Sequence, residues 1–444
     1  MYDFDKIIDR INTNSLKWEV GENELPMWVA DMDFETAPEI REELKKCVDR
    51  GIFGYSIVSE QWYDAVVYWW NKRHNFKMEK EWLQFCSGVV SAVNCVIKRI
   101  TNLGDNVLVQ TPVYNAFFSC IKNQGRNIVE NELTYDGKTY YIDFEDLEKK
   151  LSNPLTTMMI LCNPQNPSGR IWTKEELSKI GELCNKYNVV VLSDEIHCDL
   201  TDPDCDYIPF ASVSNICKNV SVTCVSTSKT FNIAGLHSAT VIIPNEKLKN
   251  NIVRGLNIDR YTGVNSFAIE ANITAYTKGE KWLDELRIYL YENKKIVYDF
   301  IEKEIPDLKV LKSEATYLMW LDCSNITKNS SELCNFIRAI VFQGKGFLKP
   351  QTFFNILNAN AALIILSCGM SLVMITGGID ISVGGVVALV SMSCAVYLDF
   401  GGGNVFISML IAVAIGLAFG IVQGFLVAYL DIQPFIVTLA GMFF

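Results

Sequence analysis

The sequence predicts a two-part chain: an α/β unit built on a mostly parallel sheet, followed by an all-α transmembrane segment. Two observations lead to this prediction. Between about residues 80 and 240, strand-like apolar runs alternate with helix-like segments, an order typical of helices packed on a parallel sheet. From residue 351 to residue 444 the chain carries only three charged residues, Asp380, Asp399 and Asp431, a composition suited to lipid.

Four continuous apolar runs in the α/β unit are predicted to be strands buried on both faces. Each ends at residues that favour turns; the runs are Val107–Gln110, Thr156–Cys162, Val189–Leu192 and Val220–Val225. A helix is predicted after Thr173, because Thr173 and Glu176 have the spacing of a capping box. Ligands of such sheets bind beyond the carboxyl ends of the strands, where this sequence places polar residues.

Composition excludes several classes of function. The chain has 40 Lys and Arg against 51 Asp and Glu, a net charge of −11, which argues against nucleic-acid binding through bulk positive charge. The first ten residues contain no apolar run, so no secretory signal is expected and the α/β unit should be cytoplasmic. The 14 cysteines include no Cys-x-x-Cys pair, and with only 3 histidines we expect free thiols and no metal centre.

Four short segments carry polar residues at strand ends or at a helix start: Asn163–Gly169, Ser193–His197, Ser226–Gly235 and Ser87–Val90. Each alone has an ordinary explanation, since Lys229 would be a solvated lysine, Asp194 a loop or capping residue and Asn166 part of a turn. Together, a lysine, a carboxylate, an asparagine and a helix N-terminus suit an aldehyde, a pyridinium nitrogen, a phenolic oxygen and a phosphate. Pyridoxal 5′-phosphate carries these four groups.

These segments resemble the fold-type-I pyridoxal phosphate enzymes of the aminotransferase class, and more closely their cystathionine β-lyase (C–S lyase) branch. The closer resemblance rests on Pro26–Phe34, Gly54–Tyr55, Thr111–Ala116 and Ser228–Leu236. It covers residues 1 to about 338. It implies an α/β large domain of the pyridoxal phosphate-dependent transferase fold type I with an incomplete small domain.

The resemblance implies a role for each matching residue. Lys229 would form the Schiff base with the cofactor and later carry a proton, and Asp194 would keep the ring nitrogen protonated. Asn166 would contact the ring oxygen with His197 nearby, a histidine that is a feature of the lyase branch. The other cofactor contacts would be Tyr114 on the ring, Val89, Val90 and Ser226 on the phosphate, and Tyr55 on the phosphate of the neighbouring subunit of a homodimer.

The implied reaction is a β-elimination from a sulfur-containing amino acid. After displacing Lys229 from the cofactor, the substrate would lose its Cα proton and then expel a thiol from Cβ. Cystathionine would give homocysteine, pyruvate and ammonia. Reprotonation at the cofactor carbon would instead make the enzyme an aminotransferase, and the motifs leave this alternative open.

Members of this family carry a late arginine whose planar guanidinium binds the substrate carboxylate. Here the last arginine is Arg338, upstream of the expected position, and no Lys or Arg follows Lys349. We therefore expect a lyase domain at residues 1–338 without this contact, which would retain the cofactor and turn over slowly.

Residues 339–444 contain three long apolar segments and the start of a fourth: Ala361–Ile375, Ser382–Leu398, Val405–Leu430 and the run from Ile432. They are predicted to be membrane spans in contact with the lipid bilayer, the alternative being a buried hairpin. Gly377–Gly385 and Phe435–Gly441 resemble the permease subunit of sugar ABC transporters of the ribose/xylose type. Sugar import is therefore the alternative function, although no ATPase P-loop is present. Asp380 is equally well a loop residue or part of a transport pathway.

The two resemblances meet near Ala339. The expected chain is therefore a membrane protein with a cytoplasmic enzyme domain, produced by a natural fusion or by a joined reading frame. Loss of both activities is a third alternative.

Overall fold

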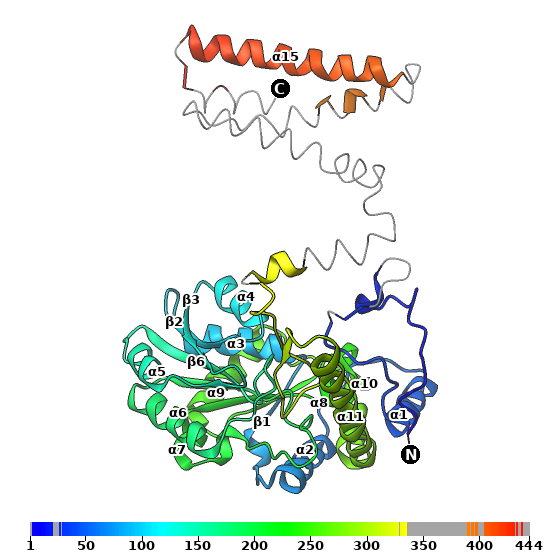
Figure 1. The fold of residues 1–444 in the computed structure, drawn as a ribbon, viewed down its shortest axis with the longest axis vertical. Helices are drawn as coiled ribbons and strands as arrows, with labels where there is room; N and C mark the ends of the chain where they lie inside the picture. The colour runs from blue at the N-terminus through cyan, green and yellow to red at the C-terminus, as the bar shows by residue number, and fades with distance from the viewer. Residues whose placement is uncertain are drawn as a thin grey trace. The chain divides into compact units, whose positions relative to one another are not determined.

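The computed structural model describes residues 2–20, 26–27, 29–327, 329–334, 389–390, 392–394, 396–397, 404–430, 432–433 and 437. The chain divides into two units, Met1–Lys328 and Asn329–Phe444. The first unit is an α/β structure around a large sheet (Figure 1). The predicted α/β fold is therefore confirmed for this part of the chain.

A seven-stranded sheet forms the centre of the first unit. Its order is β1 (Leu83–Cys86), β9 (Ala239–Ile242), β8 (Ser221–Val225), β7 (Val190–Asp194), β6 (Thr156–Cys162), β2 (Asn106–Thr111) and β3 (Asn127–Glu132). Five neighbouring strands, from β8 to β3, run parallel, whereas β9 is antiparallel to both of its neighbours. The four predicted strands are confirmed, with one difference: Ser193 and Asp194 lie inside β7 rather than after it.

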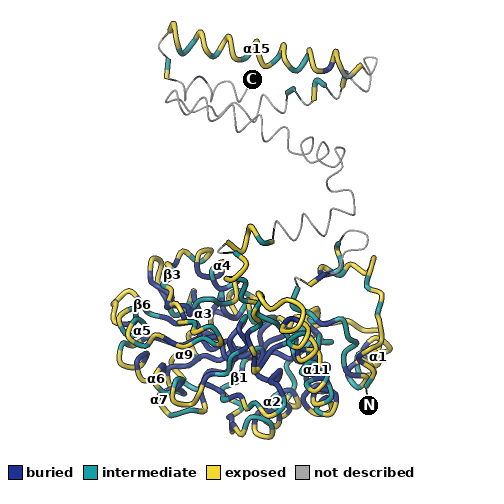
Figure 2. Tube along the Cα trace, in the orientation of Figure 1, coloured by how far each residue is buried: buried dark blue, intermediate teal, exposed yellow. Residues whose placement is uncertain are grey.

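Alternate residues of each strand point to opposite faces of the sheet. Because both sets are apolar here, helices cover both faces. On β2, Val107 and Val109 pack with α3 (Val89–Ile100), α4 (Ala116–Asn123) and α9 (Glu246–Ile258). Leu108 packs on the other face with α5 (Phe144–Leu151), α6 (Lys174–Lys186) and α7 (Asn215–Val220). Figure 2 shows the buried strands in the interior, with exposed residues on the outer surfaces of the helices.

Helix α6 begins where the sequence predicts. The Thr173 side chain accepts a hydrogen bond from the Glu176 amide (3.2 Å), and Glu176 accepts one from the Thr173 amide (2.9 Å). The predicted capping box is confirmed, and the helix buries Leu177, Ile180 and Cys184 fully.

A second core joins the N-terminal residues to α1 (Pro38–Asp49), α2 (Glu60–His74), α10 (Ser266–Lys278) and α11 (Glu280–Glu304). It contains the fully buried rings of Trp62, Trp69, Trp70, Phe231 and Trp282. Two short pairs, β4 (Thr134–Tyr135) with β5 (Tyr140–Tyr141) and β10 (Lys309–Val310) with β11 (Leu321–Asp322), are the other strands among the described residues of this unit. The described cysteines are free, as the sequence predicts.

The second unit contains the apolar helix α15 (Val405–Ala428). Its residues 406–428 have a mean hydropathy of 2.4 and are long and apolar enough to cross a membrane. The segment predicted over Val405–Leu430 thus forms an apolar helix, while its role as a membrane span stays a prediction. The span predicted over Ala361–Ile375 lies outside the described residues, as do Asp380 and Arg338. Most residues of the span predicted over Ser382–Leu398 lie outside them too.

Gly169 offers a test of the close packing at the sheet edge. It has φ +71°, and a Cβ there would lie 2.4 Å from the Ser313 Cβ and 2.6 Å from the Ala315 carbonyl oxygen. Gly169→Ala should therefore lower the free energy of unfolding by about 2–4 kcal/mol, measured by urea denaturation.

Gly137→Ala is the matched control. Gly137 has φ +90°, and a Cβ added there would meet no atom within 4 Å, so backbone strain alone should cost about 1–2 kcal/mol. Equal losses in the two variants would show that the contacts of Gly169 do not matter.

Candidate active site

The carboxyl ends of β6, β7 and β8 lie at one edge of the sheet, because these strands are parallel. Cys162 at the end of β6 pairs with Asp194 at the end of β7, and the Asn163 amide donates to the Asp194 carbonyl oxygen (2.9 Å). Lys229 lies on α8 (Thr227–Thr230), directly after β8. The sheet therefore brings the three predicted segments to one edge.

Lys229 and Asp194 are mostly buried and interact electrostatically. Burial lowers the pKa of Lys229, while the charges of Asp31 and Asp194 oppose that shift. Burial raises the pKa of Asp194 to about 6, against a hydrogen bond from the Ile196 amide and the charge of Lys229. Each charge is therefore costly by itself and is stabilised by the other.

Asn166 and His197 also meet at this edge. The Asn166 Nδ2 lies 3.5 Å from the His197 Nε2. Burial and the charge of Lys229 lower the pKa of His197 to about 3, so its imidazole is neutral at physiological pH. The buried Nδ1 of His197 has no hydrogen-bond partner among the described residues.

Two further predicted groups lie at the ends of β1 and β8, which flank β9. Val89 and Val90 are the first residues of α3, so their amides belong to the unpaired N–H groups of a helix start. Ser226 is buried; its hydroxyl donates to the Ser238 carbonyl oxygen (2.6 Å) and accepts from the Ser228 amide (3.0 Å). Its Oγ therefore caps α8.

The two predicted tyrosines are more exposed. The Tyr114 ring packs edge-on against Phe117 with centroids 5.7 Å apart, and burial together with the charge of Asp194 raises the pKa of Tyr114. Tyr55 is fully exposed and makes no hydrogen bond or ring contact among the described residues. Within one subunit, Tyr55 therefore does not lie with the other predicted site residues.

Sequence reasoning missed the partners of the lysine amine. The Lys229 Nζ donates to the Ala30 carbonyl oxygen (2.7 Å), which also accepts from the Tyr317 hydroxyl (2.8 Å). Ala30 and Asp31 belong to the Pro26–Phe34 motif, in which no role was expected for either residue. Tyr317 lies in no such motif, so only the fold places it here.

Asn232 holds the segment that carries Ala30. Its Nδ2 donates to the carbonyl oxygens of Met32 and Phe34 (both 2.8 Å), and its Oδ1 accepts from the Met32 amide (3.1 Å). Asn232 has φ 55°, a left-handed conformation that asparagine tolerates better than most residues. Three residues after the lysine, it thus positions the acceptor of the lysine amine.

The residues at this edge fit the predicted cofactor. A buried amine suits the aldehyde, and the Asp194 carboxylate, with one hydrogen bond described, suits a protonated ring nitrogen. Asn166 and the unpartnered His197 Nδ1 provide polar atoms for the ring substituents, and the N-terminus of α3 suits a phosphate.

Comparison with known proteins identifies the family. Residues 22–360 match the family model for aminotransferase class I and II. The chain is 43% identical to cystathionine beta-lyase PatB of Bacillus subtilis, over 83% of this chain and 97% of that protein. It is 32% identical to protein MalY of Escherichia coli, over 79% of this chain and 90% of that protein.

Solved structures agree with these sequence relatives. Cystalysin from Treponema denticola, which contains pyridoxal 5′-phosphate, is similar with a TM-score of 0.73 and 35% identity, over 76% of this chain and 88% of that chain. The pyridoxal phosphate-bound C–S lyase from Staphylococcus hominis gives a TM-score of 0.70 and 34% identity over the same shares.

The chain therefore belongs to the aminotransferase class I and II family. The predicted fold type I, the predicted cofactor class and the resemblance to the lyase branch are confirmed. The family match extends to residue 360, beyond the predicted boundary at residue 338, which stays a prediction. Residues 352–444 separately match a model described as a permease component of branched-chain amino acid transport, whereas the sequence resemblance is to a sugar permease.

Glu195, next to Asp194, is a buried acid that sequence reasoning did not single out. Its carboxylate accepts hydrogen bonds from the Ser193 hydroxyl (2.7 Å), the Phe210 amide (3.0 Å) and the Tyr207 hydroxyl. Burial nevertheless raises the pKa of Glu195 to about 7, because these hydrogen bonds only partly offset the loss of hydration.

This raised pKa predicts a specific pH dependence of stability in the cofactor-free protein. Because the folded pKa exceeds the ordinary value of 4.5, the contribution of Glu195 is fully present below about pH 4.5 and is lost as the pH rises through 7. Between pH 4.5 and 7.5, the free energy of unfolding should therefore fall by up to about 3 kcal/mol more in the parent protein than in Glu195→Gln.

The measurement is urea unfolding of both proteins at the two pH values. For each protein, the free energy of unfolding at one pH is subtracted from that at the other. Comparing these two differences cancels the titration of groups shared by both proteins, such as Asp194. Identical pH dependence in the two proteins would contradict the assignment to Glu195.

Proposed function

We propose that this chain is a pyridoxal phosphate-dependent carbon–sulfur β-lyase that acts on amino acids with sulfur at Cβ, such as cystathionine. The observation that carries the proposal is the buried Lys229 amine interacting with the Asp194 carboxylate at the strand ends. Relatives named cystathionine beta-lyase and C–S lyase favour this reaction over transamination.

Lys229 is the proton carrier of the proposed reaction. Burial lowers its pKa, which increases the fraction of neutral amine able to take a proton from the substrate Cα. The Ala30 carbonyl oxygen, 2.7 Å from Nζ, gives the free amine a fixed position close to the other site residues. When bound, the cofactor supplies an electron-poor ring that stabilises charge at Cα.

The remaining residues bind and orient. Asp194 would keep a carboxylate beside the ring nitrogen, and Asn166 with neutral His197 would contact the ring oxygen. Tyr114 would pack on the ring. The proposed phosphate contacts are the amides of Val89 and Val90, and Ser226 after its hydroxyl turns from the Ser238 carbonyl.

The proposal includes a homodimer in which Tyr55 reaches the phosphate of the other subunit. Around Tyr55, the apolar side chains of Ile52, Phe53 and Ile57 are all at least 64% exposed, and the Phe53 ring stacks on Phe267. A second subunit covering this surface would remove it from water. Sedimentation of the protein as a monomer would contradict the proposed homodimer.

We further propose that residues 1–338 form the cytoplasmic enzyme domain and residues 339–444 a permease-like membrane region. The support is helix α15 and the permease match of residues 352–444. Lipid is then the second partner of the chain, and sugar import remains the alternative function of this region.

Absorbance and product formation test the enzyme. The full chain with pyridoxal phosphate should become yellow and release pyruvate from cystathionine. Lys229→Ala should remove the yellow band and lower the rate by at least about 10²-fold, because the proton carrier is gone. Lys149→Ala, at an exposed lysine, is the control and should leave both readouts unchanged.

Two outcomes would reject parts of the proposal. A yellow protein that converts the substrate into its 2-oxo acid without thiol release would be an aminotransferase. Yellow colour retained in Lys229→Ala would show that another group binds the aldehyde.

Membrane extraction tests the second region. The full chain should stay in the membrane fraction after alkaline carbonate treatment. Leu417→Arg places a charge midway along α15 and should cost about 2.5–3.5 kcal/mol of insertion, releasing more of the protein, whereas Leu417→Ile should behave as the parent. Full extraction of the parent chain by carbonate would contradict membrane insertion.

A further inference from the structure

The helix that carries Lys229 is too short to hold itself in place. Helix α8 has four residues, and the first four N–H groups of any α-helix have no partner within the helix. Instead, the two threonines that flank its serine and lysine are buried and hydrogen-bonded to side chains outside the helix. The Thr227 hydroxyl donates to the Asn272 Oδ1 (2.6 Å), and the Thr230 hydroxyl donates to the Asp199 Oδ2 (3.2 Å).

Asp199 is in turn held by α2. Its Oδ1 accepts hydrogen bonds from the Trp69 Nε1 (3.0 Å) and from the His74 Nε2 (2.9 Å). Burial alone would raise the pKa of Asp199, but the hydrogen bond and charge of His74, the charge of Arg73 and the hydrogen bond from Trp69 hold it below its usual value. Asp199 is therefore an ionised carboxylate with three donors around it.

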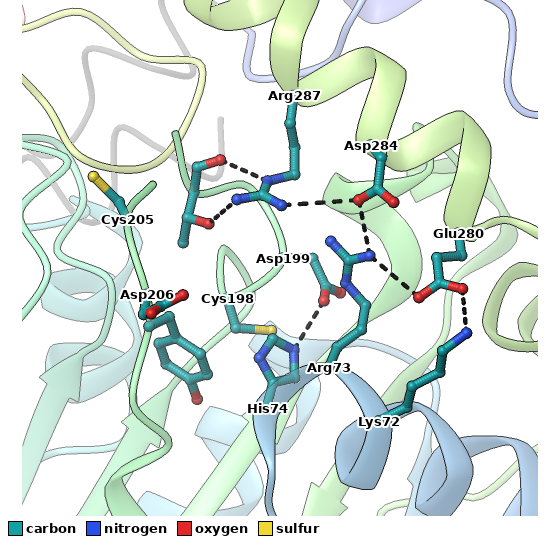
Figure 3. Close-up of a pocket in the computed structure, with 12 residues that line it drawn as sticks. Lys72, Arg73, His74, Cys198, Asp199, Cys205, Asp206, Glu280, Asp284 and Arg287 are labelled. Carbon is teal, nitrogen blue, oxygen red and sulfur yellow. Dashed lines mark hydrogen bonds and ion pairs between the residues drawn. The ribbon is translucent and has the colours of Figure 1, made fainter. Parts of the chain in front are cut away.

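The outer side of this network faces a polar cavity of about 270 Å³. Figure 3 shows its lining residues, with His74 directed at Asp199. The cationic side chains of the cavity already have partners: Arg73 pairs with Asp284 (2.9 Å), Lys72 pairs with Glu280, and Arg287 donates to the Thr201 hydroxyl (2.8 Å) and carbonyl oxygen (2.8 Å). These pairings leave few free charges to attract a ligand.

A metal ion is also disfavoured here. Ligand atoms of His74, Cys198 and Asp199 lie within 4.8 Å of one another, as in a metal site. However, the Asp199 oxygens already accept three hydrogen bonds, and three cationic side chains line the same cavity. The described contacts lead inward, from α2 through Asp199 to Thr230.

We propose that Asp199 is a positioning residue for the lyase reaction, which fixes the Lys229 amine by anchoring the adjacent Thr230 to Trp69 and His74 of α2. Asp199 reaches the lysine helix through Thr230 and is not among the residues proposed to bind the cofactor. It sets the backbone from which the lysine extends, and a displacement of about 1 Å at such a position can cost about 10²-fold in rate.

Thr230→Val tests the proposal, because it removes one hydrogen bond and nearly preserves the shape. In the full chain, kcat should fall roughly 10-fold or more while KM changes by less than about threefold. Thr230→Ser retains the hydroxyl and should restore most of kcat. Thr223→Val is the matched control: Thr223 is a buried threonine of β8 whose hydroxyl has no hydrogen-bond partner among the described residues.

A second readout is independent of turnover. In the cofactor-free chain, the rate of reductive methylation of Lys229, followed by mass spectrometry across pH, reports the position and environment of its amine. Thr230→Val and Asp199→Asn should each change this rate by at least about threefold relative to Thr223→Val. The kcat readout rests on the proposed lyase activity, whereas the methylation readout does not, so the two failures can be told apart.

Three results would overturn the inference. The first is an unchanged methylation rate in Thr230→Val. The second is loss of kcat in Thr230→Val that matches its loss of thermal stability and is not restored by Thr230→Ser. The third is one equivalent of zinc bound tightly by the full chain and lost in Cys198→Ser, which would make the cluster a metal site.

Discussion

The interaction on which this structure depends is the attraction between an amine and a carboxylate that have both left water. Burying either charge alone is costly, and a group so placed would shift its pKa and become neutral. Lys229 and Asp194 shift in opposite directions under burial, and each opposes the shift of the other. A parallel sheet makes this possible, because the ends of β7 and β8 are hydrogen-bonded neighbours and deliver the two residues to one edge.

Much of the surrounding structure serves to hold this pair. Asn272 and Asp199 anchor the two threonines of α8, and Asn232 orders the segment that presents the Ala30 carbonyl oxygen to the lysine. Glu195, directly after Asp194, is satisfied by its own set of hydrogen bonds. Buried polar groups of this kind stabilise only when they have partners, so these residues support the site through linked hydrogen bonds rather than through isolated contacts.

The sequence predicts four of the seven strands of the large sheet, the capping box of α6 and the cluster of Lys229, Asp194, Asn166 and His197, because these features follow from local patterns and from the parallel order that alternating strands and helices indicate. It predicts neither β9 nor its antiparallel direction. Tyr317 and Asp199 were also missed. Their hydrogen-bond partners lie tens to hundreds of residues away in the sequence. The residues next to Tyr317 and Asp199 in the sequence form no pattern that would indicate a role in the site.

The hydrogen bond from Lys229 to Ala30 joins residues 199 apart, and that from Tyr317 to the same carbonyl joins residues 287 apart. On the ribosome, at about 5–20 residues per second, the Ala30 carbonyl must therefore wait roughly 10–40 s for Lys229 to be made. Meanwhile, the apolar side chains of the N-terminal segment, among them Phe4 and Met32, lack the helices that later enclose them. The candidate active site thus cannot be completed before residue 317 has been made, and until then the nascent N-terminal segment leaves apolar side chains uncovered.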